Sequence, residues 1–121
     1  MISVEIPAYN EETNVLILTK KVIEQLNTCQ DDYEIIFIDD GSSDGTASKI
    51  KELHEQNPRI KLVSLSRNLG HQKALKAGID HSSGDWVICM DADMQHPPEL
   101  IPQLLEKWRQ GYDIVYTVRK E

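Results

Sequence analysis

The order of the apolar segments constrains the fold more than any other feature of this sequence. Five segments have the length and residue types of buried strands, and longer segments with the apolar spacing of helices separate them. The predicted strands are residues 2–6, 33–38, 60–65, 86–90 and 112–118. The predicted helices are residues 11–27, 47–56, 71–81 and 99–109. This alternation predicts one three-layer α/β/α sandwich over residues 1–121, with a mainly parallel sheet and right-handed crossovers.

The first predicted helix has a clear start and a clear apolar face. Asn10 is a favourable N-cap residue, and Glu11 and Glu12 would complement the helix dipole in the first turn. The residues expected to face the core are Val15, Leu18, Val22 and Leu26.

Composition and charge narrow the class of protein. The chain has 121 residues, 40% of them hydrophobic, and a formal net charge of −7. It has no basic stripe, so we expect no nucleic-acid partner, and it has no polybasic membrane anchor. No apolar run approaches the roughly 20 residues of a membrane helix, and no signal peptide is visible. Cys29 and Cys89 are far apart, and we expect both to be reduced in a cytoplasmic protein.

Polar clusters follow three of the predicted strands. They are residues 7–11, 39–42 and 91–95. Because the carboxyl ends of parallel strands meet at one edge of a sheet, and ligands bind at that edge in open α/β folds, these clusters predict a binding site. Several carboxylates at one edge are costly unless a cation or hydrogen-bond donors neutralise them.

Asp91 and Asp93 are the strongest candidates for metal ligands. They are two residues apart, so along an extended backbone their side chains would point to the same side. Together with Gln95, water and a diphosphate, they would suit Mg²⁺ or Mn²⁺. An Asp-X-Asp segment is equally compatible with a polar turn and a helix cap, so it needs support from the rest of the chain.

Other polar residues at the same edge have two interpretations each. Tyr9 could stack on a base or sugar, or could simply pack, and Arg67 could pair with phosphate oxygens. Asp44 and Thr46 are better explained as a turn and a helix cap. The chain has none of the glycine-rich dinucleotide, P-loop or nucleophile-elbow motifs.

Four segments, taken together and in order, resemble a known family. They are Pro7–Glu12, Asp39–Thr46, Ser66–Gly70 and Asp91–Glu99. This set is similar to the N-terminal half of a family-2 glycosyltransferase with the Rossmann-like GT-A fold. The dolichyl- or polyprenyl-phosphate sugar transferases, the dolichol-phosphate mannosyltransferase branch, resemble it most. The resemblance extends over essentially all 121 residues.

The resemblance implies a donor, an acceptor and a set of site residues. The implied donor is a nucleotide-diphosphate sugar of the UDP-glucose or GDP-mannose type. The implied acceptor is a polyprenyl or dolichyl phosphate at the cytoplasmic face of the membrane. The implied nucleotide-binding residues are Pro7, Tyr9, Glu11, Asp40, which would contact the base, and Arg67. The implied ligands of Mg²⁺ or Mn²⁺ are Asp91, Asp93 and Gln95. Catalytic residues on the acceptor side are expected beyond Glu121.

Three alternatives stay open at this point. The first is a transferase of the same fold with a saccharide acceptor, and the second is a nucleotide-binding fragment without turnover. The third, a receiver-like signalling domain, would need a lysine at the end of the last strand, where this chain has Thr117, Val118 and Arg119.

The apolar fifth strand leads to an expectation about the chain itself. Because residues 114–118 are apolar on both faces, they should lie inside a larger sheet. We therefore expect this chain to be the N-terminal part of a longer protein, inactive by itself. Exposed apolar surface and open strand edges favour self-association, as a homodimer for example.

Overall fold

The structure is a computed structural model that describes residues 1–29, 31–67, 69–84 and 86–90, with residues 92, 98, 101–103 and 106. The four strands it describes are β1 (Ile2–Ala8), β2 (Tyr33–Asp39), β3 (Ile60–Ser64) and β4 (Trp86–Cys89). The three helices between them are α1 (Val15–Thr28), α2 (Thr46–Gln56) and α3 (His71–His81). The predicted strand 112–118 and most of the predicted helix 99–109 lie outside the described residues.

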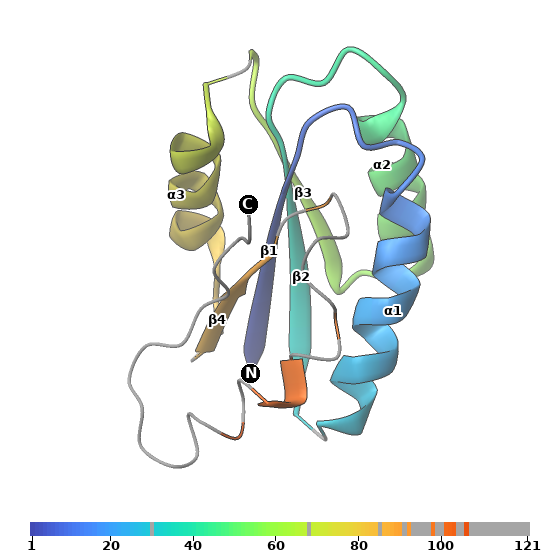
Figure 1. The fold of residues 1–121 in the computed structure, drawn as a ribbon, viewed down its shortest axis with the longest axis vertical. Coiled ribbons are helices and arrows are strands. Elements are labelled where there is room, and N and C mark those ends of the chain that lie inside the picture. The colour runs from blue at the N-terminus through green and yellow to red at the C-terminus, as the bar shows by residue number, and fades with distance from the viewer. Residues whose placement is uncertain are drawn as a thin grey trace.

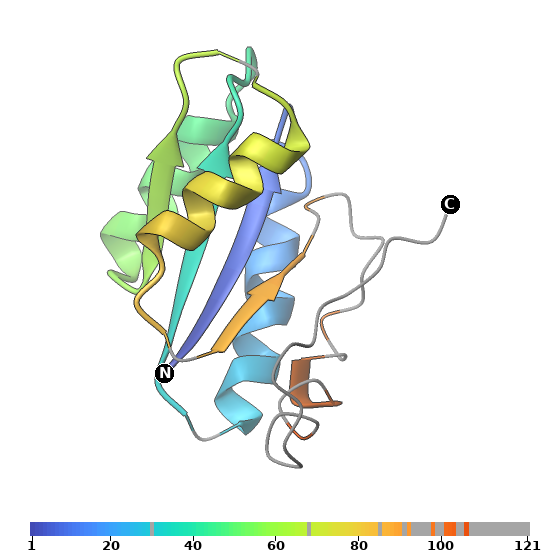
Figure 2. The same cartoon turned by 90° about the vertical axis from the view of Figure 1, so that its left-hand side faces the viewer.

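The described strands form one parallel sheet in the order β3-β2-β1-β4 (Figures 1 and 2). Ala8 of β1 is level with Asp39 of β2, and Asp39 is level with Ser64 of β3. The carboxyl ends of these three strands therefore lie at the same height. The predicted parallel sheet is confirmed for this part of the chain.

Helices cover both faces of the sheet, which gives the predicted three layers. Figure 1 shows α1 and α2 on one face and α3 on the other. The larger core lies under α1, where the four residues predicted to face it are at most 1% exposed. They are Val15, Leu18, Val22 and Leu26. Within the described residues, no helix has both the length and the apolar character that crossing a bilayer requires.

The helix on the other face approaches the sheet closely at one glycine. A Cβ atom at Gly78 would lie 2.7 Å from Cδ1 of Ile38 and 3.0 Å from Cδ of Glu5. Because both neighbours are buried strand side chains, a larger residue here would push α3 away from the sheet. A small residue at this position allows α3 to close over β1 and β2.

The start of α1 differs from the sequence prediction. The helix begins at Val15 with Asn14 in the N-cap position, and not at Glu11 with Asn10 as its cap. Asn10 has a φ of 54°, which is the left-handed region, whereas Asn14 in the N-cap position has a φ of −102°. The prediction was wrong because the side chain of Asn10 bonds to the turn after β2 instead of to the start of the helix.

The face of the sheet under α3 carries a buried polar cluster around Glu34. Its Oε2 accepts hydrogen bonds from Ser3 Oγ at 2.5 Å and from the backbone N–H of Ser83 at 2.6 Å. Lys61 Nζ lies 2.7 Å from Oε1. Burial by itself would raise the pKa of Glu34, but these hydrogen bonds together lower it. Glu34 is therefore a paired anion that links β1, β2, β3 and the segment before β4.

Glu5 is the second buried acid on this face, and its environment is different. It is fully buried in β1, and among the described residues its Oε1 has no hydrogen-bond partner. The thiol of Cys89 donates a long contact of 3.7 Å to Oε2. Burial, together with the negative charges of Glu34 and Asp80, raises the pKa of Glu5 from 4.5 to about 7. The raised pKa favours the neutral acid over the carboxylate inside the domain.

This environment predicts a pH dependence of stability. Below about pH 4.5 the carboxyl group of Glu5 is protonated in both the folded and the unfolded chain, so it imposes no penalty. As the pH rises from 4.5 through 7, the unfolded chain ionises first, and the folded state loses stability, by roughly 3–3.5 kcal/mol in total at about 1.4 kcal/mol per pKa unit. Glu5→Gln should remove this loss of stability, which is measured as the difference in the free energy of urea unfolding between pH 5 and pH 8. Glu52→Gln, an exposed control on α2, should leave it unchanged. An identical pH dependence in wild type and Glu5→Gln would contradict this assignment.

Candidate functional site

The candidate site lies where β1, β2 and β3 end. Backbone pairing continues one step past the strands: the N–H of Asp40 donates to the carbonyl of Ala8 at 3.0 Å, and that of Leu65 donates to the carbonyl of Asp39 at 2.9 Å. The three loops that follow therefore leave the sheet together, at the top of Figure 1. The sequence predicted this shared edge for the clusters at residues 7–11 and 39–42, with Arg67 nearby, and the structure confirms that the strands before them end together. The third predicted cluster, residues 91–95, lies largely outside the described residues.

The first two of these loops are joined through Asn10. Its backbone N–H donates to Ser42 Oγ at 2.9 Å, and its side-chain Oδ1 accepts from the backbone N–H of Ser43, also at 2.9 Å. The next residue continues the contact, because the N–H of Glu11 donates to Thr46 Oγ1 at 2.9 Å. Residues more than 30 positions apart thus hold each other in place.

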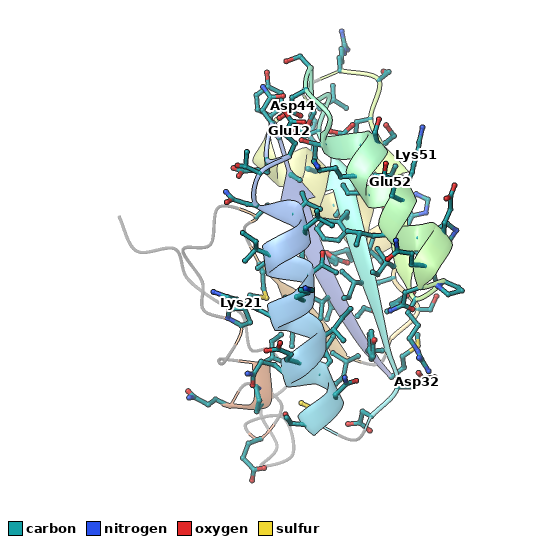
Figure 3. The ribbon with its side chains drawn as sticks, turned by 90° about the vertical axis from the view of Figure 1, so that its right-hand side faces the viewer. Glu12, Lys21, Asp32, Asp44, Lys51 and Glu52 are labelled. Carbon is teal, nitrogen blue, oxygen red and sulfur yellow. The ribbon has the colours of Figure 1, made fainter. Side chains whose placement is uncertain are left out.

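Glu12 and Asp44 extend the same contact at the start of α2. Oε2 of Glu12 accepts from the backbone N–H of Gly45 at 3.1 Å, and Figure 3 shows the two acidic side chains next to each other. A Cβ atom at Gly45 would collide with that carboxylate oxygen, so a larger residue here would displace the end of the Glu12 side chain. Asp44 accepts from the N–H and the hydroxyl of Thr46, and the hydroxyl bond is the main cause of its lowered pKa. The predicted turn at Asp44 is confirmed, but the N-cap position of α2 is occupied by Gly45, and Thr46 is the first residue of the helix.

Four of the predicted nucleotide-binding residues lie near this edge. Three of them lie in β1 or directly after it, and the fourth follows β3. Tyr9 is 47% exposed, so its ring is available to a ligand. Glu11 is half-buried, and its Oε2 accepts from Asn14 Nδ2 at 2.8 Å. Pro7 is buried within β1, level with Ile38. Arg67 is exposed in the loop after β3.

The two acids at the end of β2 already have partners inside the protein. Asp39 Oδ1 accepts from the N–H of Ser42 at 3.0 Å, and Asp40 Oδ1 accepts from the N–H of Leu69 at 2.8 Å. Both side chains are at most 5% exposed. A carboxylate has two oxygens and about four lone pairs, so Asp40 can hold the loop before α3 and still accept a hydrogen bond from a ligand.

Sequence reasoning missed Leu69 and the serine pair Ser42 and Ser43. The serines signalled a turn, but nothing local identified Asn10 as their partner. An apolar residue such as Leu69 contributes here only through its backbone N–H, which no side-chain pattern reveals.

The predicted metal ligands Asp91, Asp93 and Gln95 lie outside the described residues. Met90 directly precedes them, and its N–H donates to the carbonyl of Glu5 at 2.9 Å, next to β1. In the described part of the chain, no three His, Cys, Asp or Glu side chains gather as a metal site. The oxygen ligands that these residue types supply are those that Mg²⁺ and Mn²⁺ prefer.

Comparison with known proteins agrees with this arrangement. The model of the family described as glycosyl transferase family 2 matches residues 3–121. An uncharacterized glycosyltransferase of Synechocystis sp. is 49% identical over 119 residues, which are 98% of this chain and 37% of that protein. An undecaprenyl-phosphate 4-deoxy-4-formamido-L-arabinose transferase of Edwardsiella ictaluri is 44% identical over 121 residues, 99% of this chain and 37% of that protein. The chain thus spans little more than a third of these relatives.

Two solved structures share the fold. A mannosyltransferase from Pyrobaculum calidifontis, in complex with GDP-Man and Mn²⁺, is 29% identical with a TM-score of 0.66. The match covers 76% of this chain and 27% of that one. S. aureus TarS in complex with UDP is 25% identical with a TM-score of 0.60, and the same shares of each chain are covered.

The Asp40 contact generates a prediction that needs no ligand. Asp40→Ala removes the acceptor of the Leu69 N–H, and a hydrogen bond to a charged group contributes about 1.5–3 kcal/mol. Hydrogen exchange at the Leu69 amide should therefore become roughly 10 to 100 times faster, at about 1.4 kcal/mol per tenfold. Asp40→Asn keeps an acceptor oxygen and should preserve most of the protection. Asp32→Ala, at the opposite end of the sheet in Figure 3, is the control. Unchanged exchange in Asp40→Ala would show that this bond does not hold the loop.

Proposed function

Because the chain belongs to glycosyl transferase family 2, we propose that it forms the donor-binding part of a transferase that acts on a lipid phosphate. The donor is a nucleotide-diphosphate sugar, and the acceptor is a polyprenyl or dolichyl phosphate at the cytoplasmic face of a membrane. The observation that carries this proposal is the convergence of three strand ends. It places the exposed ring of Tyr9 and the buried carboxylate of Asp40 at one edge.

In this proposal, different described residues contact different parts of the donor. The Tyr9 ring can stack on the base, and Asp40 can accept a hydrogen bond from a base N–H. Arg67, which is exposed on the next loop, supplies a positive charge for the diphosphate. Glu11 and Pro7 flank Tyr9 in the chain, and Glu11 is half-buried beside it, whereas Pro7 is buried within β1.

A divalent cation completes the proposed site. Asp91, Asp93 and Gln95 would hold Mg²⁺ or Mn²⁺, as the Mn²⁺ in the Pyrobaculum complex suggests for the family. Such an ion stabilises the negative charge that grows on the departing nucleoside diphosphate.

The transfer itself needs little help from a base. An acceptor phosphate oxygen attacks the anomeric carbon, and the bond from that carbon to the β-phosphate oxygen breaks, which releases the nucleoside diphosphate. A phosphate monoester is already anionic at neutral pH, so no strong base has to remove a proton. The name of the Edwardsiella relative supports an acceptor of this class.

The metal prediction can be checked by calorimetry on the intact gene product. Wild type should bind UDP or GDP more tightly when Mn²⁺ is present, because an ion held by Asp91, Asp93 and Gln95 would offset the negative charge of the diphosphate. Asp93→Ala should lose that enhancement, and Asp32→Ala should keep it. If Asp93→Ala retained the full Mn²⁺ effect, the metal site would have to lie elsewhere.

The base contact can be separated from the loop contact of Asp40. Asp40→Asn should hold Leu69 as before, but it presents an amide N–H₂ in place of a carboxylate oxygen. We expect nucleoside diphosphate binding to weaken by about 1.5–3 kcal/mol, the range for a hydrogen bond to a charged group. Equal affinity in variant and wild type would remove Asp40 from the base site. Comparison of UDP with GDP identifies the base.

The acceptor is tested by a transfer assay with labelled UDP-glucose or GDP-mannose and a polyprenyl phosphate. We expect label in the lipid phase, attached to phosphate. Label that appears only in a soluble or polymeric saccharide would favour a saccharide acceptor and contradict this proposal.

A further inference from the structure

Asn10 has an unusual backbone at the point where two proposed donor contacts meet. It lies between Tyr9 and Glu11, and among the described residues it is the one non-glycine with positive φ, at 54°. Asparagine, aspartate and glycine adopt this left-handed conformation more readily than other residues. Residues held in such conformations cluster at binding and active sites.

Its contacts are specific but contribute nothing to the hydrophobic core. Asn10 is exposed, yet Oδ1 accepts from the backbone N–H of Ser43 at 2.9 Å and from its hydroxyl at 3.4 Å. Its own N–H donates to Ser42 Oγ at 2.9 Å. An exposed residue outside the core usually affects global stability little, so a role limited to folding does not account for this set of contacts.

The contacts of Asn10 fix the direction in which its neighbours leave the strand. Ala8 ends β1 in register with Asp39, so Tyr9 is the first residue free of the sheet. Two residues later, the N–H of Glu11 is held by Thr46 at the start of α2. The orientation of Tyr9 is thus bounded by the sheet on one side and by the contacts of Asn10 on the other.

We propose that Asn10 is a positioning residue for the donor nucleotide, which orients Tyr9 and Glu11 through its left-handed backbone and its bonds to Ser42 and Ser43. The inference rests on the proposed function, because it assumes that a nucleotide binds at this edge. Its physical basis is preorganisation: a loop that is already ordered does not have to lose conformational freedom when the ligand binds.

Three substitutions at this position separate backbone from side chain. Asn10→Ala disfavours the left-handed backbone and removes the acceptor. Asn10→Gly keeps the backbone but removes the acceptor, and Asn10→Asp keeps both. Because aspartate adds a negative charge that would repel a diphosphate, the affinity of each variant is measured for the uncharged nucleosides uridine and guanosine as well as for UDP and GDP. For the uncharged nucleosides, we expect wild type and Asn10→Asp to bind most tightly and with similar affinity. Asn10→Gly should bind more weakly, and Asn10→Ala most weakly.

Asn57 offers a matched control at the opposite edge of the sheet. Its Oδ1 also accepts a backbone N–H, that of Arg59, at 3.1 Å. Asn57→Ala therefore removes the same kind of bond far from the proposed site. It should change the melting temperature about as much as Asn10→Ala does, and leave nucleotide affinity unchanged.

The experiment is calorimetry of the intact gene product with UDP and GDP in the presence of Mn²⁺, together with thermal melts and donor kinetics. We expect Asn10→Ala to weaken binding about tenfold and to raise the donor KM with kcat unchanged, and Ser42→Ala to act in the same direction. Ser42→Thr, which keeps the hydroxyl, should restore affinity. If Asn10→Ala does not fold, the Gly variant carries the test.

Three results would contradict the account, and they separate the positioning role from the proposed function. Wild-type affinity in both Asn10→Ala and Asn10→Gly, with a wild type that binds nucleotide, overturns the positioning role alone. The same holds if Asn57→Ala loses as much affinity as Asn10→Ala. A wild type that binds neither UDP nor GDP overturns the proposed function itself.

Discussion

The register of the parallel sheet is the constraint on which the candidate site depends. Ala8, Asp39 and Ser64 lie level on adjacent strands, so three loops begin at one height. A shift of one residue would turn the side chains of a strand to the opposite face. The apolar residues of β1 and β2 are buried on both faces by α1, α2 and α3, which specifies the register strongly. The packing of the core therefore determines where Tyr9 and Asp40 are placed.

The loops add a second level of order through polar bonds between distant residues. Asn10 holds the turn after β2, and Asp40 holds the segment before α3. Individually such bonds contribute modestly to stability, about 0.5–1.5 kcal/mol for neutral groups. Together they join three loops into one surface. A ligand can then bind to a surface that is already formed.

The parts that could be predicted from sequence are those with local causes. The predicted bounds of β2 and α3 agree with the observed ones within one residue, because a nearly continuous apolar run and clear helix ends define them. The turn at Asp44 depends on Thr46, only two positions away. The start of α1 could not be predicted, because Asn10 bonds to residues over 30 positions away. The alternating pattern around Glu5 likewise did not reveal a fully buried acid, because only the packing of α3 covers that face.

The most direct test of donor binding at this edge is amide NMR of the protein titrated with UDP or GDP in the presence of Mg²⁺. The account predicts chemical-shift changes at residues 9–12, 40–43 and 69–70, where the three loops leave the sheet. Residues 31–32 and 57–59, at the opposite end, should not respond. Shifts confined to that opposite end, or no shifts at saturating nucleotide, would contradict the account.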